Sequence, residues 1–109
     1  MIKSLSILTR KSTLSPEAFR TVWVNEHAPL VRSVPQVRRY VLSFVLEQPA
    51  RALVPIHDLR IDAIAELWYD DAASMREAAA SEAMQKVLEN GALYLEAIKN
   101  VITEEIAII

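Results

Sequence analysis

The clearest pattern of hydrophobic and polar positions in the chain lies between residues 15 and 31. Two large aromatic residues, one histidine and one leucine recur there at intervals of four, four and three residues: Phe19, Trp23, His27 and Leu30. Residues at this spacing share one face of an α-helix. The pattern therefore predicts a helix whose apolar face carries a single histidine. That histidine is either a tolerated polar guest in the core or a working group in a pocket.

The limits of this helix are also indicated. Ser15 can cap the first turn, Pro16 occupies a first helical position where its missing N–H costs nothing, and Glu17 adds a favourable negative charge. The helix is expected to continue to about Ser33. Pro29 lies inside the stretch and is expected to kink the helix, or to end its regular part, near residue 27 or 28.

Four other segments are rich in β-branched and aromatic residues, which predicts β-strands. They cover residues 1–9, 37–46, 60–69 and 99–108. Between the last two, Asp71 and Ser81 can each cap a short helical segment. The second segment is expected to extend through Leu88, and the Asn90-Gly91 pair is expected to stop or break it.

The order of these elements is β-α-β-β-α-β, which is typical of a ferredoxin-like α+β fold. In that fold a four-stranded antiparallel sheet carries both helices on one face. The 109 residues suffice for one such domain, residues 1–109. The strands are apolar on both faces, so a second copy of the chain is expected to cover the face without helices, in a homodimer. Residues 47–59, with two prolines and no periodicity, predict a long loop of a length that is often functional.

Composition narrows the possible functions. The absence of cysteine excludes a disulfide scaffold, a thiolate metal site and a cysteine nucleophile. The net charge is −2 without a basic block, so no nucleic-acid partner is expected. No apolar run approaches the roughly 20 residues of a membrane helix, and the N-terminus lacks the features of a signal peptide, so we expect a cytoplasmic protein with no membrane partner. With one glycine the chain has no phosphate-binding loop, and no cofactor is expected.

A longer motif extends the helical pattern. The stretch F-R-x-x-W-x-x-x-H-A-P-L-V, Phe19 to Val31, is followed by Pro35 and by Arg39-Tyr40. Together with MIKSLSILTRKSTLSPEAF at the start and IDAIAELWYDDAASM further on, it resembles the EthD family of dimeric α+β barrels over nearly the whole chain. The segment F-x-x-x-W-x-x-x-H-A-P is the most specific part, because it fixes five residue types over eleven positions. EthD-like proteins are encoded alongside oxidative degradation systems.

A related branch, the methylmuconolactone methylisomerases, rearranges small lactones and is the closest resemblance. The chain is similar to it in RIDAIAELWY, in the near-terminal ITEE and in the loop end VPIHDLRIDAI. The resemblance places the family's helix histidine at His27 and its strand tyrosine at Tyr40. That branch also uses cysteines in its pocket, whereas this chain has Leu67 where one would be expected in the third strand.

His27 and Tyr40 are therefore the leading catalytic candidates. An imidazole can accept and return protons near neutral pH. The alternative is a buried histidine that is hydrogen-bonded to backbone or to Glu26. The Tyr40 phenol can donate a hydrogen bond to a substrate carbonyl or carboxylate, or it can be a core tyrosine whose hydroxyl reaches the surface.

Two carboxylates on the predicted third strand are further candidates. Glu66 could orient His27 or act as a base with a raised pKa. Its alternative role is an ion pair with Arg38 or Arg39 across neighbouring strands. Asp62, on the same strand face, could contact substrate or lie at a solvated strand end.

The remaining candidates are aromatic residues and a second histidine. The aromatic side chains are expected in the core or in the wall of a substrate pocket: Phe19, Trp23, Phe44 and Trp68. His57 lies beside Asp58 in the long loop. The two histidines and the scattered acids match no recognised metal-binding spacing, so no metal is expected, although a site that joins His27, His57 and a carboxylate stays open.

These observations favour a small cofactor-independent enzyme that acts on a small organic acid, lactone or polyketide-like ring by proton transfer, either as an isomerase or beside an oxidative pathway. A second hypothesis is a non-catalytic binding protein that carries a hydrophobic metabolite for an oxygenase system. A third is a structural dimer in which His27 is sealed in packed core. The three differ in whether an open cavity lies beside His27.

Overall fold

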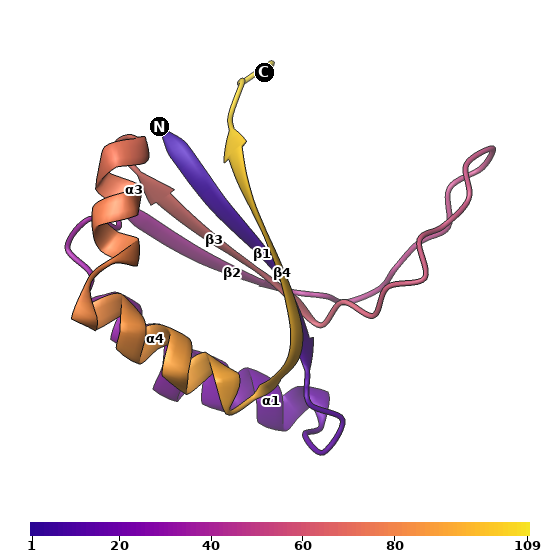
Figure 1. Ribbon diagram of the computed structural model, residues 1–109. Helices are drawn as coiled ribbons and strands as arrows, with labels where there is room; N and C mark the ends of the chain where they lie inside the picture. The colour runs from indigo at the N-terminus through magenta and orange to yellow at the C-terminus, as the bar shows by residue number, and fades with distance from the viewer.

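The computed structural model describes all 109 residues. The chain forms one four-stranded antiparallel sheet with its helices on one face (Figure 1). The helices and strands follow in this order: β1 (Ile2–Arg10), α1 (Pro16–Val22), η1 (Trp23–His27), α2 (Ala28–Val31), β2 (Arg39–Phe44), β3 (Ala63–Tyr69), α3 (Ala72–Ala79), α4 (Glu82–Ala92) and β4 (Leu95–Glu104). The strands lie side by side in the order β2-β3-β1-β4. The predicted ferredoxin-like α+β plan, β-α-β-β-α-β, is therefore confirmed.

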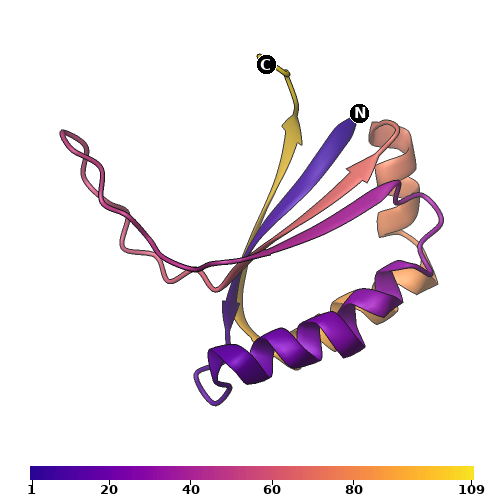
Figure 2. The same ribbon diagram turned by 180° about the vertical axis from the view of Figure 1, so that it is seen from behind.

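The strand register decides which side chains face the helices. Tyr40 in β2 is paired with Leu67 in β3, Leu67 with Ser4 in β1, and Ser4 with Ile102 in β4. Directly opposed residues point to the same side of a sheet, so these four side chains form one row. The row lies on the helix side. Neighbouring residues such as Glu66 point to the opposite face, which no helix covers (Figure 2).

The core between sheet and helices consists of two separate clusters. One cluster packs beneath α2, α3 and α4 and contains Val31, Val34, Tyr69, Ala78, Met84 and Val87. The other packs beneath α1 and η1 and contains Leu8, Phe19, Trp23, Ala63 and Ala65. Aromatic and aliphatic side chains from both layers thus fix the helices on the sheet at two places, and the space between those places is not filled by either cluster.

The first helix has a widened turn at the position where the sequence predicted an irregularity. The N–H of Ala28 donates to the carbonyl of Trp23, five residues earlier, which makes η1 a π-helical turn. Pro29 follows at once; it has no N–H to donate, and its ring crowds the carbonyl four residues before it. The helix does not end there, however, because α2 continues through Pro29 to Val31.

Several predicted boundaries shift. The second and third strands are shorter than predicted, and the chain between them, residues 45–62, projects away from the sheet as a long arm (Figures 1 and 2). The predicted fourth strand began at residue 99, whereas β4 begins at Leu95 and ends at Glu104. The Asn90-Gly91 pair was expected to stop the preceding helix, and that prediction is wrong because α4 continues to Ala92.

The three predicted helix caps are all present. Ser15, Asp71 and Ser81 each accept a hydrogen bond from the backbone N–H three residues later, at the starts of α1, α3 and α4. None of the helices combines the length and the apolar character needed to cross a bilayer.

Candidate functional site

A cavity of about 700 Å³ lies between the helices and the sheet, bounded by side chains from both core clusters. Its volume falls in the range of roughly 300–1,000 Å³ that is usual for small-molecule sites. Most of its wall is apolar, and the polar side chains that reach it are few: Ser4, Ser6, His27, Tyr40, Arg76, Glu96 and Asn100.

The cavity exists because the central strands carry short side chains where they face the helices. Ser4 and Ser6 of β1 and Ala65 of β3 all line it. A layer of large residues at these positions would fill the space between helix and sheet, as close packing normally does. These short residues therefore form a floor beneath the side chains that descend from η1 and α4.

His27 reaches this cavity from η1 and is held in place from several sides. Its ring stacks on Trp23, with centroids 3.8 Å apart and planes inclined by 21°. The residue is only 5% exposed. Behind it the helix α4 comes so close that a Cβ on Gly91 would lie 3.2 Å from His27 Cε1. Gly91 is therefore needed for close approach to His27 rather than as the predicted helix stop.

A hydrogen-bond chain sets the tautomer of His27. Its Nδ1 lies 2.9 Å from Oδ1 of Asn90, and the Asn90 Nδ2 donates to Glu26 at 3.4 Å. Tyr94 Oη donates to the other Glu26 oxygen at 2.5 Å. A carboxylate only accepts hydrogen bonds, so the Asn90 NH₂ group must face Glu26 and its carbonyl oxygen must face His27. Nδ1 of His27 therefore carries the proton, and Nε2 has a free lone pair.

The charge state of His27 follows from its burial. Removal from water lowers the pKa of His27 below its ordinary value of 6.5, and this effect outweighs the opposing influence of Asn90 and Glu26. Nε2 makes no hydrogen bond within the protein, and it is not one of the fully buried atoms that lack a partner, so it remains accessible. Because His27 lines the cavity, this free nitrogen is available to a ligand there. At neutral pH His27 is thus an uncharged base at the cavity wall.

Tyr40 faces the same cavity from β2. Burial raises its pKa to about 12, partly offset by the neighbouring Trp23 indole, so the phenol keeps its proton at neutral pH. The Trp23 Nε1 atom is buried and has no hydrogen-bond partner that meets normal geometry. A phenol and an indole N–H, both donors, therefore lie close together on the wall that also carries His27.

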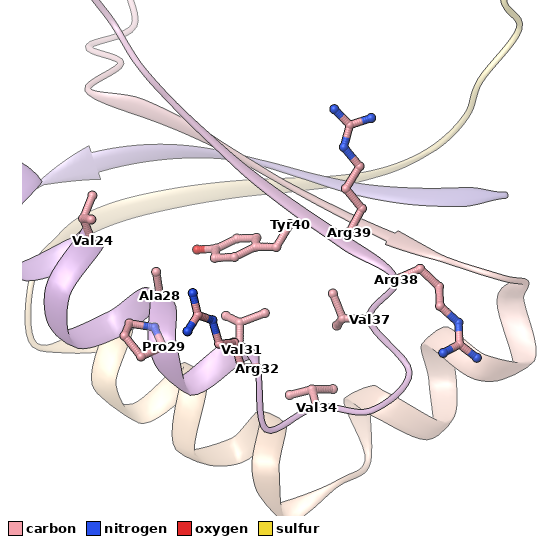
Figure 3. Close-up of a pocket in the computed structure, with 10 residues that line it drawn as sticks. All are labelled: Val24, Ala28, Pro29, Val31, Arg32, Val34, Val37, Arg38, Arg39 and Tyr40. Atoms are coloured by element: carbon pink, nitrogen blue, oxygen red, sulfur yellow. The ribbon is translucent and has the colours of Figure 1, made fainter.

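Tyr40 also borders a second, smaller pocket of about 320 Å³ at the outer side of β2. Figure 3 shows the Tyr40 ring projecting from β2 toward Ala28, while Arg39 points to the other side of the strand. Tyr40 and Val31 line both spaces, so these two side chains separate the small pocket from the main cavity. The face of β2 that meets the ligand space is thus the one with Tyr40.

Glu66 is not brought to this site. It points to the uncovered sheet face, where its carboxylate binds Lys3 Nζ at 2.8 Å. Lys3 also pairs with Glu105 at 3.5 Å, and the cations of Lys3 and Arg39 lie over the Trp68 ring at 5.2 and 4.8 Å. The prediction that Glu66 orients His27 is wrong, because the sheet separates them and Asn90 makes that contact. The expected ion-pair alternative is present, with Lys3 rather than an arginine as the partner.

Asp62 and Trp68 also lie away from the cavity. Asp62 precedes β3, accepts a hydrogen bond from the Arg10 N–H at 2.8 Å, and forms ion pairs with Arg10 and Arg60 at 3.3 and 3.4 Å. Trp68 shares the uncovered face with Glu66 and donates its indole N–H to Glu105. Asp62 therefore has a structural role at the start of β3, and within one chain neither residue can contact a ligand in the cavity.

The other predicted aromatic residues divide between core and cavity wall. Phe19 is 1% exposed and contacts Phe44 edge to face at 6.3 Å, so both belong to the packed cluster beneath α1. Neither lines the cavity, whereas Trp23 does. The predicted wall therefore consists of Trp23 alone among these side chains.

The residues that meet His27 from α4 and the polar group on the cavity floor were not among the predicted site residues. Asn90 and Gly91 are 63 and 64 residues beyond His27, and no local pattern connects them. The inward serines of β1 did carry a signal, since Ser4 and Ser6 interrupt an otherwise apolar strand face between Ile2 and Leu8. His57 lies on the projecting arm, and nowhere do three or more His, Asp or Glu side chains gather as metal ligands would.

Comparison with known proteins agrees with this architecture. The EthD domain matches residues 11–93. An EthD family protein from Bacillus halodurans has a TM-score of 0.79 at 20% identity and covers 97% of this chain and 99% of its own. A dimeric ferredoxin-like protein of unknown function from Thermobifida fusca has a TM-score of 0.69 at 15% identity, over 94% of this chain and 88% of its own.

A further solved structure with the same fold is SnoaB from Streptomyces nogalater, described as a cofactor-independent oxygenase. Its N63A mutant has a TM-score of 0.62 at 14% identity and covers 95% of this chain and 91% of its own. No protein of curated function matches this sequence significantly. At these identities the solved structures establish the shared fold alone, whereas the domain match over most of the chain establishes the family: the protein belongs to the EthD family.

Proposed function

We propose that this protein is a small cofactor-independent enzyme that moves a proton on a small, mostly apolar ligand held in the 700 Å³ cavity. The observation that carries the proposal is His27, an uncharged imidazole whose Nε2 lone pair borders the cavity while Nδ1 is fixed by Asn90. A base in this state can accept a proton from an acidic C–H or O–H group without first losing one of its own.

The neighbouring groups suit such a step. As Nε2 takes the proton, negative charge develops on a ligand oxygen, and the Tyr40 phenol can donate a hydrogen bond to it. Because the pKa of Tyr40 is about 12, the phenol remains a donor throughout the neutral range. The imidazolium can then return the proton to a different atom of the ligand, which is an isomerisation. The mostly apolar wall offers few polar groups that would compete for the charged intermediate.

The ligand class follows from the wall. Apolar side chains dominate it, so a small lactone, an aromatic or alicyclic acid, or a polyketide-like ring with an acidic proton fits better than a sugar or a nucleotide. The methylmuconolactone methylisomerase branch supplies one such reaction. SnoaB, which has the same fold, is a cofactor-independent oxygenase, so oxygenation without a cofactor is a second type of reaction carried out on this fold.

We also propose that two copies pack with their uncovered sheet faces together. That face carries apolar side chains at its centre, including Leu5, Ile7 and Val41, which are only partly buried in one copy. The ferredoxin-like protein from Thermobifida fusca is dimeric, which supports the pairing of two copies. The ion pairs around Trp68 would then lie at the interface.

The test is deuterium exchange at the acidic carbon of candidate ligands in D₂O, followed by NMR, because exchange reports proton transfer even when the product is unknown. The panel would contain butenolides and hydroxylated aromatic acids. We expect exchange with the wild type, and a loss of at least 100-fold in His27→Gln because the base is absent. Tyr40→Phe should lose roughly 10- to 100-fold, the scale of one donor to developing charge.

The control is His57→Gln, which removes the other histidine from the arm and should leave exchange unchanged. Equal exchange in wild type and His27→Gln would refute the assignment of the base. A ligand that binds tightly but neither exchanges nor changes over long incubation would instead identify the protein as a carrier.

A further inference from the structure

The cavity has a second polar group, on the wall that is formed by β1 and β4. The Asn100 Nδ2 atom donates to Oγ of Ser4 at 2.7 Å and to Oγ of Ser6 at 2.9 Å, with a weaker contact to the Leu5 carbonyl at 3.4 Å. Ser6 is directly opposite Asn100 in the register, and Ser4 lies two residues away on the same face. All three side chains line the cavity.

We propose that Ser4, Ser6 and Asn100 form an oxygen-binding subsite that orients the far end of a ligand whose reacting end meets His27 and Tyr40. This inference rests on the proposed function, because it concerns the same cavity and names the class of ligand that fills it. It adds a second recognition point and thereby limits the ligand to molecules with oxygen at both ends.

The hydrogen-bond inventory of the group shows what it can bind. Asn100 uses its NH₂ group on the two serine oxygens, which leaves its Oδ1 atom without a partner. Each serine accepts from Asn100 but donates to no protein atom, so each retains its own O–H proton. The group therefore presents two hydroxyl donors and one amide acceptor. It carries no charge, so it suits a neutral carbonyl or hydroxyl oxygen.

The location of the group argues against a purely structural role. Strand β1 is the second from the edge, and Ser6 is 7% exposed, at a position where a valine would pack against apolar neighbours. Of the three side chains only Ser6 is buried, and burial of a hydroxyl whose proton has no acceptor costs free energy, whereas Ser4 is half-buried and Asn100 is exposed, so water can reach their unused donor and acceptor. A ligand oxygen that entered the cavity would complete these hydrogen bonds.

The sheet geometry sets the length of the ligand. Ser4 lies in the same cross-strand row as Tyr40, with Leu67 of β3 between them. Adjacent strands are about 4.8 Å apart, so the two positions are separated by roughly 10 Å. A rigid unit of two or three fused rings with a neutral oxygen at each end can span this distance and leave its apolar body over Leu67.

The test compares two probes by isothermal titration calorimetry: 2,6-dihydroxynaphthalene, with oxygen at both ends, and 2-naphthol, with oxygen at one. We expect the wild type to bind the dihydroxy compound about 5- to 25-fold more tightly, the scale of one or two neutral hydrogen bonds. The Ser4→Ala/Ser6→Ala variant should lose this preference and bind 2-naphthol within twofold of the wild type. Asn100→Leu should lose the preference as well.

The matched control is Ser43→Ala, a strand serine on the opposite sheet face, which should keep the preference. Calorimetry records binding without turnover, so a preference that persists where the wild type exchanges no ligand proton distinguishes a failure of proton transfer from a failure of the subsite. An undiminished preference in Ser4→Ala/Ser6→Ala would overturn the proposal, as would equal weakening for both probes or failure of the wild type to bind either one. The melting temperature of each variant identifies any that has failed to fold. If Ser4→Ala/Ser6→Ala fails to fold, Asn100→Leu tests the same loss of preference.

Discussion

The replacement of Asn90 by aspartate tests the argument for the charge state of His27 most directly. The change places a carboxylate where an amide oxygen now accepts the Nδ1–H hydrogen bond at 2.9 Å. Glu26, now 3.4 Å from the Asn90 amide nitrogen, would lie next to a second negative charge, and the imidazolium form of His27 would relieve the repulsion between the two. The variant should therefore raise the pKa of His27 and leave less of the unprotonated base near neutral pH.

The magnitude can be worked from the hydrogen bond itself. A hydrogen bond with a charged partner contributes about 1.5–3 kcal/mol, compared with about 1 kcal/mol for a neutral one. The difference is about 0.5–2 kcal/mol, and 1.4 kcal/mol corresponds to a factor of ten, so the proton affinity of His27 should rise roughly 2- to 30-fold in Asn90→Asp. Asn90→Leu, of similar size but without a polar group, should lower the proton affinity, since the hydrogen bond to Asn90 opposes the effect of burial.

The assay is an NMR titration of the imidazole nitrogens in a His57→Gln background, so that His27 is the single histidine observed. Deuterium exchange on a responsive ligand should follow the same shift, with the active limb of the Asn90→Asp profile moved to higher pH. Proton affinities that changed in the same direction in Asn90→Asp and Asn90→Leu, or that stayed within twofold of the wild type, would refute the assigned hydrogen-bond chain.

Three further results follow from the geometry. Helix propensity alone predicts that Gly91→Ala stabilises the protein by about 1 kcal/mol, the difference expected in chemical denaturation between Lys86→Ala and Lys86→Gly at an exposed position of the same helix. Alanine at 91 crowds His27, so we expect instead no gain in the free energy of unfolding, or a loss of up to ~2 kcal/mol. A gain of the full ~1 kcal/mol would mean that the His27 ring is free to move aside. Burial lowers the pKa of His27 in the folded protein, so as the pH falls below 6.5 the unfolded chain takes up a proton before the folded one does, and the protein should become less stable. The melting temperature of His27→Gln should lack this part of the pH dependence; the same dependence in both proteins would contradict the prediction. Glu66→Gln should destabilise the fold by no more than about 1 kcal/mol, since Lys3 keeps its pairing with Glu105, and should leave ligand exchange intact; loss of exchange in a folded variant would return Glu66 to the site.

The fold could be predicted because its signals are local. Period-2 and period-3.6 patterns located every strand and helix within a few residues, and the three caps at Ser15, Asp71 and Ser81 depend only on the next four residues. The alternation of β3 also separated its two faces correctly. What that pattern could not supply was which face the helices cover, because both faces of the strand carry apolar residues.

The site was predictable only in part, because its decisive contacts join distant segments. His27 and Tyr40 were identified from the helical stripe and the family motif, and the structure places both at one cavity. Asn90, which fixes the imidazole, belongs to a different helix, and no sequence pattern specifies which residue of that helix meets His27. Glu66 was misplaced for the same reason, since choosing the wrong face of one strand moves a side chain through the whole thickness of the sheet.

One local feature nevertheless connects the sequence to the site. Pro29 cannot donate a backbone hydrogen bond, and the turn before it widens so that the Ala28 N–H bonds to Trp23, five residues back. Single π-helical turns of this kind occur frequently at functional sites. Here the rings of Trp23 and His27 stack with centroids 3.8 Å apart, and a Cβ on Gly91 would lie 3.2 Å from the imidazole, so a side chain there would crowd the ring. The proline that sequence rules treat as a break in the helix therefore follows directly on the turn that carries the base, and the single glycine of the chain lies where that base packs against α4.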